Sequence, residues 1–97
     1  MENGMNKLDF GPIERAHITQ TEYAKILGVS RVTVANWVRG TEPSPFLGRA
    51  AQTLLDQIDE AVAEGRLPGE LEHMVPTERT VEERLGIIRG ALEVDNQ

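Results

Sequence analysis

The feature that most constrains the fold is the segment 19–39, where two short helical signals are separated by one glycine. Thr19 and Glu22 have the spacing of a capping box, which starts a helix. Gly28 is suited to end that helix in a left-handed conformation. Ser30 is a favourable N-cap for a second helix. The segment therefore predicts two helices that cross at a tight turn, over residues 20–27 and 31–38.

The second of these helices has two chemically different faces. Val34 and Trp37 are three residues apart, so both are expected to point into the core, with Val38 beside them. Core packing is favoured over base stacking for Trp37 because it belongs to this apolar stripe. The opposite face is short, polar and basic, and suits a DNA major groove. It presents Arg31, Val32, Ala35, Asn36 and Arg39.

The motif resembles a known family. The run Thr-Gln-x-x-x-Ala-x-x-Leu-Gly-Val-Ser begins at Thr19 and is followed by Val34, Trp37, Gly40 and Pro43. This pattern is similar to the phage lambda repressor and Cro-like helix-turn-helix proteins, also called the Xre class. The resemblance covers roughly residues 18–54. It implies a DNA-binding domain whose second motif helix enters the major groove.

The resemblance also implies roles for individual residues. Arg31, Val32 and Asn36 fall at positions that read bases. Their chemistry fits this role, since Arg can bind guanine, Asn can pair with adenine, and Val can contact a thymine methyl group. The positions implied for backbone contacts are Gln20, Ser30, Thr33, Arg39 and Thr41. For Gln20 the resemblance implies either a phosphate or a base contact. Tyr23 could reach a phosphate through its hydroxyl or be half-buried.

Helix signals continue on both sides of the motif. Residues 9–16 can form a short first helix whose inward side chains would be Phe10, Ile13 and Ala16. Ser44 followed by a proline predicts a helix from 45 to about 64. Thr80 and Glu83 have capping-box spacing, so a last helix is expected from 81 to about 93. Residues 1–9 and 95–97 are expected to be frayed ends.

We therefore expect an all-α fold, a lambda repressor-like helix-turn-helix bundle with an extended acidic C-terminal helical extension. Residues 1–64 form the predicted DNA-binding domain. Residues 65–80 contain two prolines and two glycines and are expected to be a linker, with one helical turn around 70–74. Residues 81–97 would form a C-terminal element that either mediates oligomerisation or completes the core.

The net charge of −6 is unusual for a DNA-binding protein, because phosphate neutralisation requires Lys and Arg. The distribution of charge removes part of this objection. Residues 1–45 carry five basic and five acidic side chains, whereas residues 46–97 carry five Arg and eleven acids. The acidic excess therefore lies in the second half, which could dock a protein partner.

The helices predicted over 45–64 and 81–93 each carry an apolar seam along one face. Each seam could complete the core or form an interface between two copies. A dimer is favoured because one short helix reads only a few base pairs, and two half-sites need two copies. The residues expected at a dimer interface are Leu47, Leu54, Ile58, Val81, Leu85, Ile88 and Leu92. The side chains expected to widen the first seam are Phe46, Ala50, Leu55 and Val62.

Other classes of function have weaker support. The chain has no cysteine, and His17 and His73 are far apart in sequence, so no metal site or other cofactor is expected. No catalytic constellation or nucleotide-binding fingerprint is present, which argues against an enzyme. The absence of a signal peptide and of a membrane-length apolar run favours a soluble, cytoplasmic protein.

The favoured function is a dimeric transcriptional regulator, a repressor of phage or bacterial type that binds double-stranded DNA. One alternative is a non-transcriptional DNA adaptor, such as a small terminase-like or recombination-directionality protein of a phage. Another is an antitoxin-like module that binds protein.

Overall fold

The computed structural model describes residues 8–93, and the expected terminal tails fall almost entirely outside this range. The described part of the chain is all-helical and contains no strand, which confirms the expected fold class. Its helices are α1 (Gly11–Arg15), α2 (Gln20–Leu27), α3 (Arg31–Val38), α4 (Pro45–Ala63), the 3-10 helix η2 (Gly69–His73) and α5 (Val81–Leu92). None of the helices within residues 8–93 has the length and apolar character needed to cross a bilayer.

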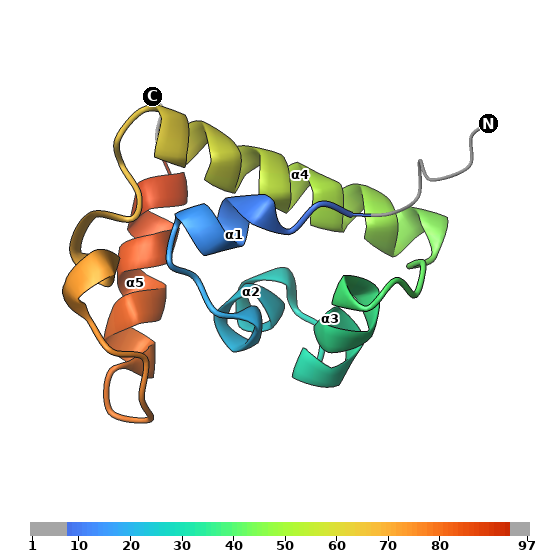
Figure 1. Cartoon of the computed structure of the whole chain (residues 1–97), viewed down its shortest axis with the longest axis horizontal. Helices are drawn as coiled ribbons and strands as arrows, with labels where there is room; N and C mark the ends of the chain where they lie inside the picture. The colour runs from blue at the N-terminus through green and yellow to red at the C-terminus, as the bar shows by residue number, and fades with distance from the viewer. Residues whose placement is uncertain (1–7, 94–97) are drawn as a thin grey trace.

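The longest helix, α4, forms one side of the molecule (Figure 1). Helices α1 and α2 pack against α4, and α3 packs against α2. Helix α5 stands across the end of α4 and also contacts α2 and η2 (Figure 1). The C-terminal helix is therefore packed against the first helix of the motif.

The local signals around the motif act as the sequence predicts. The Thr19 hydroxyl accepts from the Glu22 backbone N–H at 3.0 Å, and the Glu22 carboxylate accepts from the Thr19 N–H at 3.0 Å. This is the expected capping box at the start of α2. Gly28 ends α2 with a φ of 94°, in the left-handed region that glycine adopts without a Cβ penalty.

The core is formed by apolar side chains from every helix. Phe10, Ile13 and Ala16 are buried, as expected for the first helix. Tyr23 is fully buried, so the expectation that it is half-buried or bound to phosphate is wrong. Its ring meets Phe10 edge to face, with ring centres 5.5 Å apart, and its hydroxyl donates to the Ala51 carbonyl at 2.7 Å. Burial raises the pKa of Tyr23 well above its usual value.

The start of α5 differs from the prediction. Thr80 precedes the helix, but its side chain makes no capping bond to α5. Its hydroxyl instead donates to the Val75 carbonyl at 2.8 Å and accepts from the Thr77 N–H at 2.9 Å. The predicted capping box with Glu83 does not form because the preceding turn already uses this hydroxyl.

The first turn of α4 also departs from the expected seam. Phe46 is 82% exposed, and Ala50 is exposed as well. Both were expected to widen the apolar seam, but the buried side chains of α4 begin only at Ala51. Farther along the helix, Leu55 is buried and Val62 packs against the core, in line with the prediction.

The C-terminal segments contribute directly to the core. Leu67 and Leu71, within the expected linker, are 2% and 1% exposed. Four residues expected at a dimer interface are buried inside the chain itself, namely Leu54, Ile58, Leu85 and Ile88. We correct the expected interface accordingly, because side chains enclosed by their own core cannot meet a second copy. Of that set, Leu47, Val81 and Leu92 remain partly exposed.

Candidate nucleic-acid interface

Helices α2 and α3 form the predicted pair, joined by a short turn at Gly28. The Ser30 hydroxyl accepts from the Thr33 backbone N–H at 3.1 Å and so caps α3. The Ser30 and Thr33 hydroxyl oxygens are also hydrogen-bonded to each other at 2.8 Å. Two of the residues expected to contact the DNA backbone are therefore held together at the N-terminus of α3.

The inner face of α3 anchors the helix in the core. Val34 is fully buried and Trp37 is 6% exposed, which confirms their expected supporting role. Val38 was expected beside them, but it is 43% exposed. It follows Trp37 by one residue, and the helical rotation of about 100° per residue carries it away from the core. The stripe that anchors α3 is therefore narrower than predicted.

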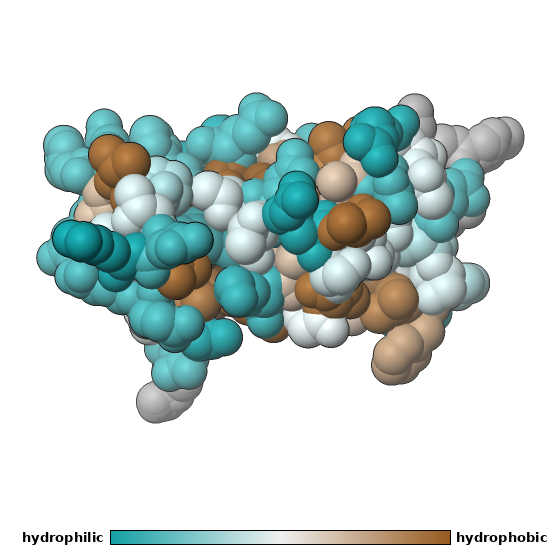
Figure 2. All heavy atoms as spheres, turned by 90° about the horizontal axis from the view of Figure 1, so that it is seen from below, coloured by the Kyte–Doolittle hydropathy of each residue, from teal (hydrophilic) through white to brown (hydrophobic). Residues whose placement is uncertain are grey.

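The outer face of α3 is open to solvent. Arg31 is exposed at the first helical position, and Val32 is 59% exposed beside it. Figure 2 shows the molecule from the side on which α2 and α3 lie, where apolar side chains reach the surface on the α3 side among polar ones. The side chains of Arg31 and Val32 are therefore free to approach a ligand.

Asn36 and Arg39 form a pair on this face. The Arg39 Nη2 atom donates to the Asn36 Oδ1 atom at 2.6 Å. Asn36 is half-buried and Arg39 is exposed, so the guanidinium holds the amide at the edge of the surface. The amide nitrogen of Asn36 keeps its two donors, and its oxygen keeps a second lone pair.

The two remaining residues expected to contact the DNA backbone, Gln20 and Thr41, lie on either side of α3 in the chain. Gln20 is half-buried at the first position of α2, and no hydrogen bond within residues 8–93 joins its side chain to α3. Thr41 is exposed after Gly40, and its backbone N–H donates to the Asn36 carbonyl at 3.0 Å. The structure thus links Ser30 to Thr33 and Asn36 to Arg39, but places Gln20 on a separate helix.

Sequence reasoning did not assign a role to Arg84. Its guanidinium is buried and forms an ion pair with Glu22 of α2, with a distance of 2.6 Å between Nε and Oε2. A signal for this was present, because Arg84 follows Val81 by three residues and precedes Ile88 by four. It therefore lies on the apolar stripe of its helix, where a charge requires a buried partner.

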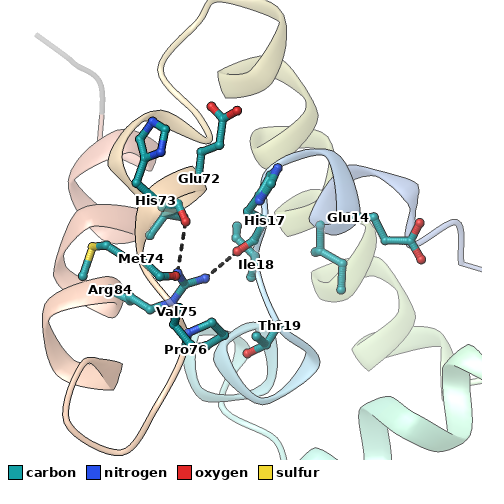
Figure 3. Close-up of a pocket in the computed structure, with 12 residues that line it drawn as sticks. Glu14, His17, Ile18, Thr19, Glu72, His73, Met74, Val75, Pro76 and Arg84 are labelled. Carbon is teal, nitrogen blue, oxygen red and sulfur yellow. Dashed lines mark hydrogen bonds between the residues drawn. The ribbon is translucent and has the colours of Figure 1, made fainter.

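A pocket lies between the α1–α2 turn and η2 (Figure 3). His17 and His73 both line it, although they are distant in sequence. No group of three or more histidine or acidic side chains within the described range could hold a metal ion. The Arg84 guanidinium closes the inner end of the pocket and donates to the His17 and Met74 carbonyls.

Comparison with protein-family models gives a match to the motif. Residues 13–50 match a family model described as helix-turn-helix. The matched range contains α2 and α3 entire, with parts of α1 and α4. No curated protein and no solved structure matches the chain. The remaining C-terminal residues, including α5, lie outside the matched range.

Proposed function

We propose that this chain, whose residues 13–50 match a helix-turn-helix family model, is a sequence-specific transcriptional repressor of the lambda repressor and Cro-like class. In this role α3 enters the major groove of double-stranded DNA. The observation that carries the proposal is the division of α3 into two faces. Val34 and Trp37 fix the helix in the core, while Arg31 and Val32 project from the surface.

Arg31, Val32 and Asn36 are the proposed base-reading residues. Arg31 lies at the N-terminal end of α3, the end of a recognition helix that contacts base edges. A guanidinium can donate two hydrogen bonds to guanine, and an exposed valine can pack on a thymine methyl group. Asn36 can donate to adenine N7 while its oxygen accepts from adenine N6.

Arg39 is the proposed link between base reading and backbone binding. Its hydrogen bond to Asn36 restricts the amide before DNA arrives. Its charge can also meet a phosphate, together with Gln20, Ser30, Thr33 and Thr41. Since residues 29–41 contain two arginines and no acid, α3 is locally positive on an acidic chain. Repression would follow either from steric occlusion of the bound DNA or from contact with the polymerase. The proposed place of action is the cytoplasm.

The sharpest test of this proposal compares Asn36→Ala and Arg39→Ala in a selected-site binding assay. Asn36→Ala should lose discrimination at one base position, by about 1–3 kcal/mol. Arg39→Ala should weaken binding at all sequences and lower the dependence of affinity on salt, with a smaller loss of discrimination at the Asn36 base position than Asn36→Ala causes. If Asn36→Ala instead weakens DNA binding equally at all sequences, Asn36 contacts the DNA backbone rather than a base. Wild-type protein without salt-sensitive DNA binding would favour a protein-binding module.

We also propose that two copies bind an inverted repeat. The apolar side chains open to a second copy include Phe46 and the half-exposed Leu47, both in the first turn of α4. Only residues 39–44 separate this turn from α3, so a contact there would place an α3 helix of each copy close to the dimer interface. Identical half-sites bound by a symmetric dimer are the usual arrangement for such motifs.

The mass of the protein in solution tests the proposed dimer. Phe46→Ala should shift a dimer toward monomer and weaken binding to a full inverted repeat more than binding to a half-site. Val75→Ala is the matched control, since Val75 is also an exposed apolar side chain, 72% accessible, but lies far along the chain from α3. A ring or other large oligomer would contradict the dimeric repressor and favour a DNA adaptor of the phage terminase type.

A further inference from the structure

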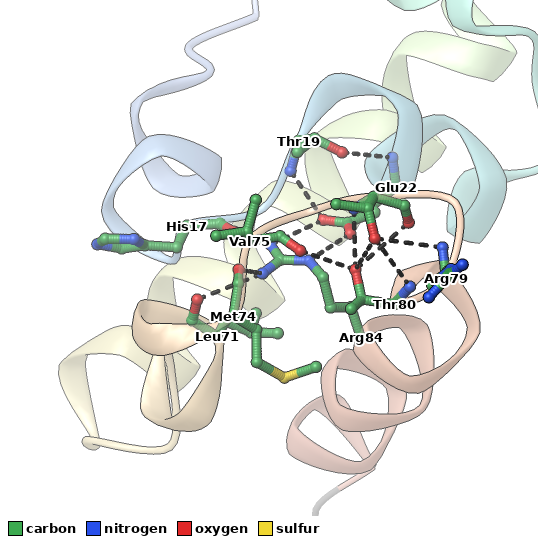
Figure 4. Close-up of polar contacts among 10 residues, drawn as sticks. His17, Thr19, Glu22, Leu71, Met74, Val75, Arg79, Thr80 and Arg84 are labelled. Atoms are coloured by element: carbon green, nitrogen blue, oxygen red, sulfur yellow. Dashed lines mark hydrogen bonds and ion pairs between the residues drawn. The ribbon is translucent and has the colours of Figure 1, made fainter.

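Arg84 connects the C-terminal helix to the motif through a buried network (Figure 4). Its side chain is 1% exposed and that of Glu22 is 2% exposed. The Nε atom donates to Glu22 Oε2 at 2.6 Å, and Nη2 donates to Glu22 Oε1 at 3.2 Å. This two-point contact fixes the orientation of the carboxylate as well as neutralising its charge.

The remaining donors of Arg84 reach backbone carbonyls from two other segments. Nη2 donates to the His17 carbonyl in the turn between α1 and α2. Nη1 donates to the Leu71 carbonyl at 3.3 Å and to the Met74 carbonyl. A guanidinium has five N–H donors, and these contacts occupy all of them. Arg84 is therefore fully satisfied and cannot act as an anion-binding site in this fold.

Glu22 has a second partner that belongs to the motif itself. Its Oε1 atom accepts from the Thr19 backbone N–H, and its own N–H donates to the Thr19 hydroxyl. The same carboxylate thus closes the capping box of α2 and pairs with α5. Because α2 packs directly on α3, the position of the first turn of α2 affects the orientation of both helices of the motif.

The turn that leads into α2 is also held by the Arg84 guanidinium. His17 has a φ of 62°, a left-handed conformation that residues other than glycine rarely adopt. Its carbonyl is the one that accepts from Arg84. One side chain of α5 therefore restrains both the entry to α2 and its first turn.

We infer that Arg84 is a positioning residue for DNA binding, which acts through Glu22 to hold the N-terminal end of α2 in its binding orientation. The inference rests on the proposed DNA-binding function. It makes the C-terminal helix, which lies outside the matched family range, a requirement for the motif's affinity. The base preference should not depend on Arg84, since the base-reading residues lie on α3.

The test uses the full chain with three variants, Arg84→Met, Glu22→Gln/Arg84→Met and Arg89→Met. The double variant removes both buried charges, so it avoids the unpaired carboxylate that could unfold the single variant. Arg89 is the matched control, since it is an exposed arginine on the same helix. DNA affinity is measured at a temperature where far-ultraviolet circular dichroism shows each protein folded. Amide hydrogen exchange is measured on the same samples.

The folded double variant should bind DNA about tenfold more weakly, within the range by which coupled sites influence each other. Its order of preference among DNA sequences should be unchanged, and exchange should accelerate at the first amides of α2 but not in the middle of α4. Arg89→Met should behave as wild type in exchange and in sequence preference.

Wild-type affinity and wild-type exchange in the folded double variant would overturn the inference and leave the proposed function intact. Absence of DNA binding by the wild type would overturn the proposed function. The exchange measurement would then still report whether Arg84 holds the start of α2.

Discussion

Tyr23 is the clearest case of a residue whose environment sets its chemistry. It is the chain's single tyrosine, fully buried, with its hydroxyl donating to the Ala51 carbonyl. Desolvation disfavours the ionised phenolate and raises the pKa of Tyr23. The hydroxyl is therefore a structural hydrogen-bond donor that ties α2 to α4.

This shift predicts a dependence of stability on alkaline pH. The ordinary tyrosine pKa is about 10. Because the folded-state pKa is higher, the contribution of Tyr23 to stability is complete below about pH 10 and is lost as pH rises above that value. Tyrosinate absorbance and circular dichroism should therefore change together in one alkaline transition. Ionisation near pH 10 in a chain that keeps its helical signal would contradict this.

Tyr23→Phe serves as the control for the alkaline transition. It removes the ionisable group, so its free energy of unfolding should depend less on pH above about pH 10. At neutral pH it should lower that free energy by about 1 kcal/mol, the usual net value of a lost hydrogen bond. Urea unfolding at several pH values measures both effects.

At the scale of elements, the helices begin and end largely where short-range signals place them. The Thr19 capping box, Ser30 and Ser44 all act as N-caps. Thr80 is the exception, because its hydroxyl is used within the Thr77–Thr80 turn. A capping pattern can be read from spacing alone, whereas a competing turn depends on the path of the preceding chain.

Two glycines should respond in opposite ways to the same substitution. Gly28 has a left-handed φ, so Gly28→Ala should lower the free energy of unfolding by about 1–2 kcal/mol. Gly86 lies inside α5, and a Cβ there would meet no atom within 4 Å. Gly86→Ala should therefore raise the free energy of unfolding by about 0.5–1 kcal/mol. Urea denaturation measures both changes in the free energy of unfolding. If the two substitutions change it in the same direction, the assigned conformations are contradicted.

At the scale of the whole molecule, the C-terminal segments are part of the folding unit. Helix α5 supplies Leu85 and Ile88 to the interior and Arg84 to the ion pair with Glu22. The partners in that pair are 62 positions apart in the chain. The matched helix-turn-helix range and the residues beyond it therefore share one core.

Deleting residues 81–97 should consequently unfold the protein. The deletion removes Arg84, the partner of Glu22, together with Leu85 and Ile88, which α5 supplies to the interior. It also exposes apolar surface on α2 and α4, and the total stability of such a domain is only about 5–15 kcal/mol. Thermal unfolding followed by circular dichroism should lose its cooperative transition. A truncated chain that melts cooperatively at the wild-type midpoint would show that α5 is dispensable.

The sequence by itself determined the motif between Thr19 and Arg39, the helices around it and the inward role of Val34 and Trp37. These features depend on hydrogen bonds and side-chain periodicity within a few residues, which spacing reveals directly. Tertiary structure alone decided that Phe46 is exposed and that Arg84 pairs with Glu22. Those outcomes depend on which distant helix covers each face, and local periodicity carries no information about that neighbour.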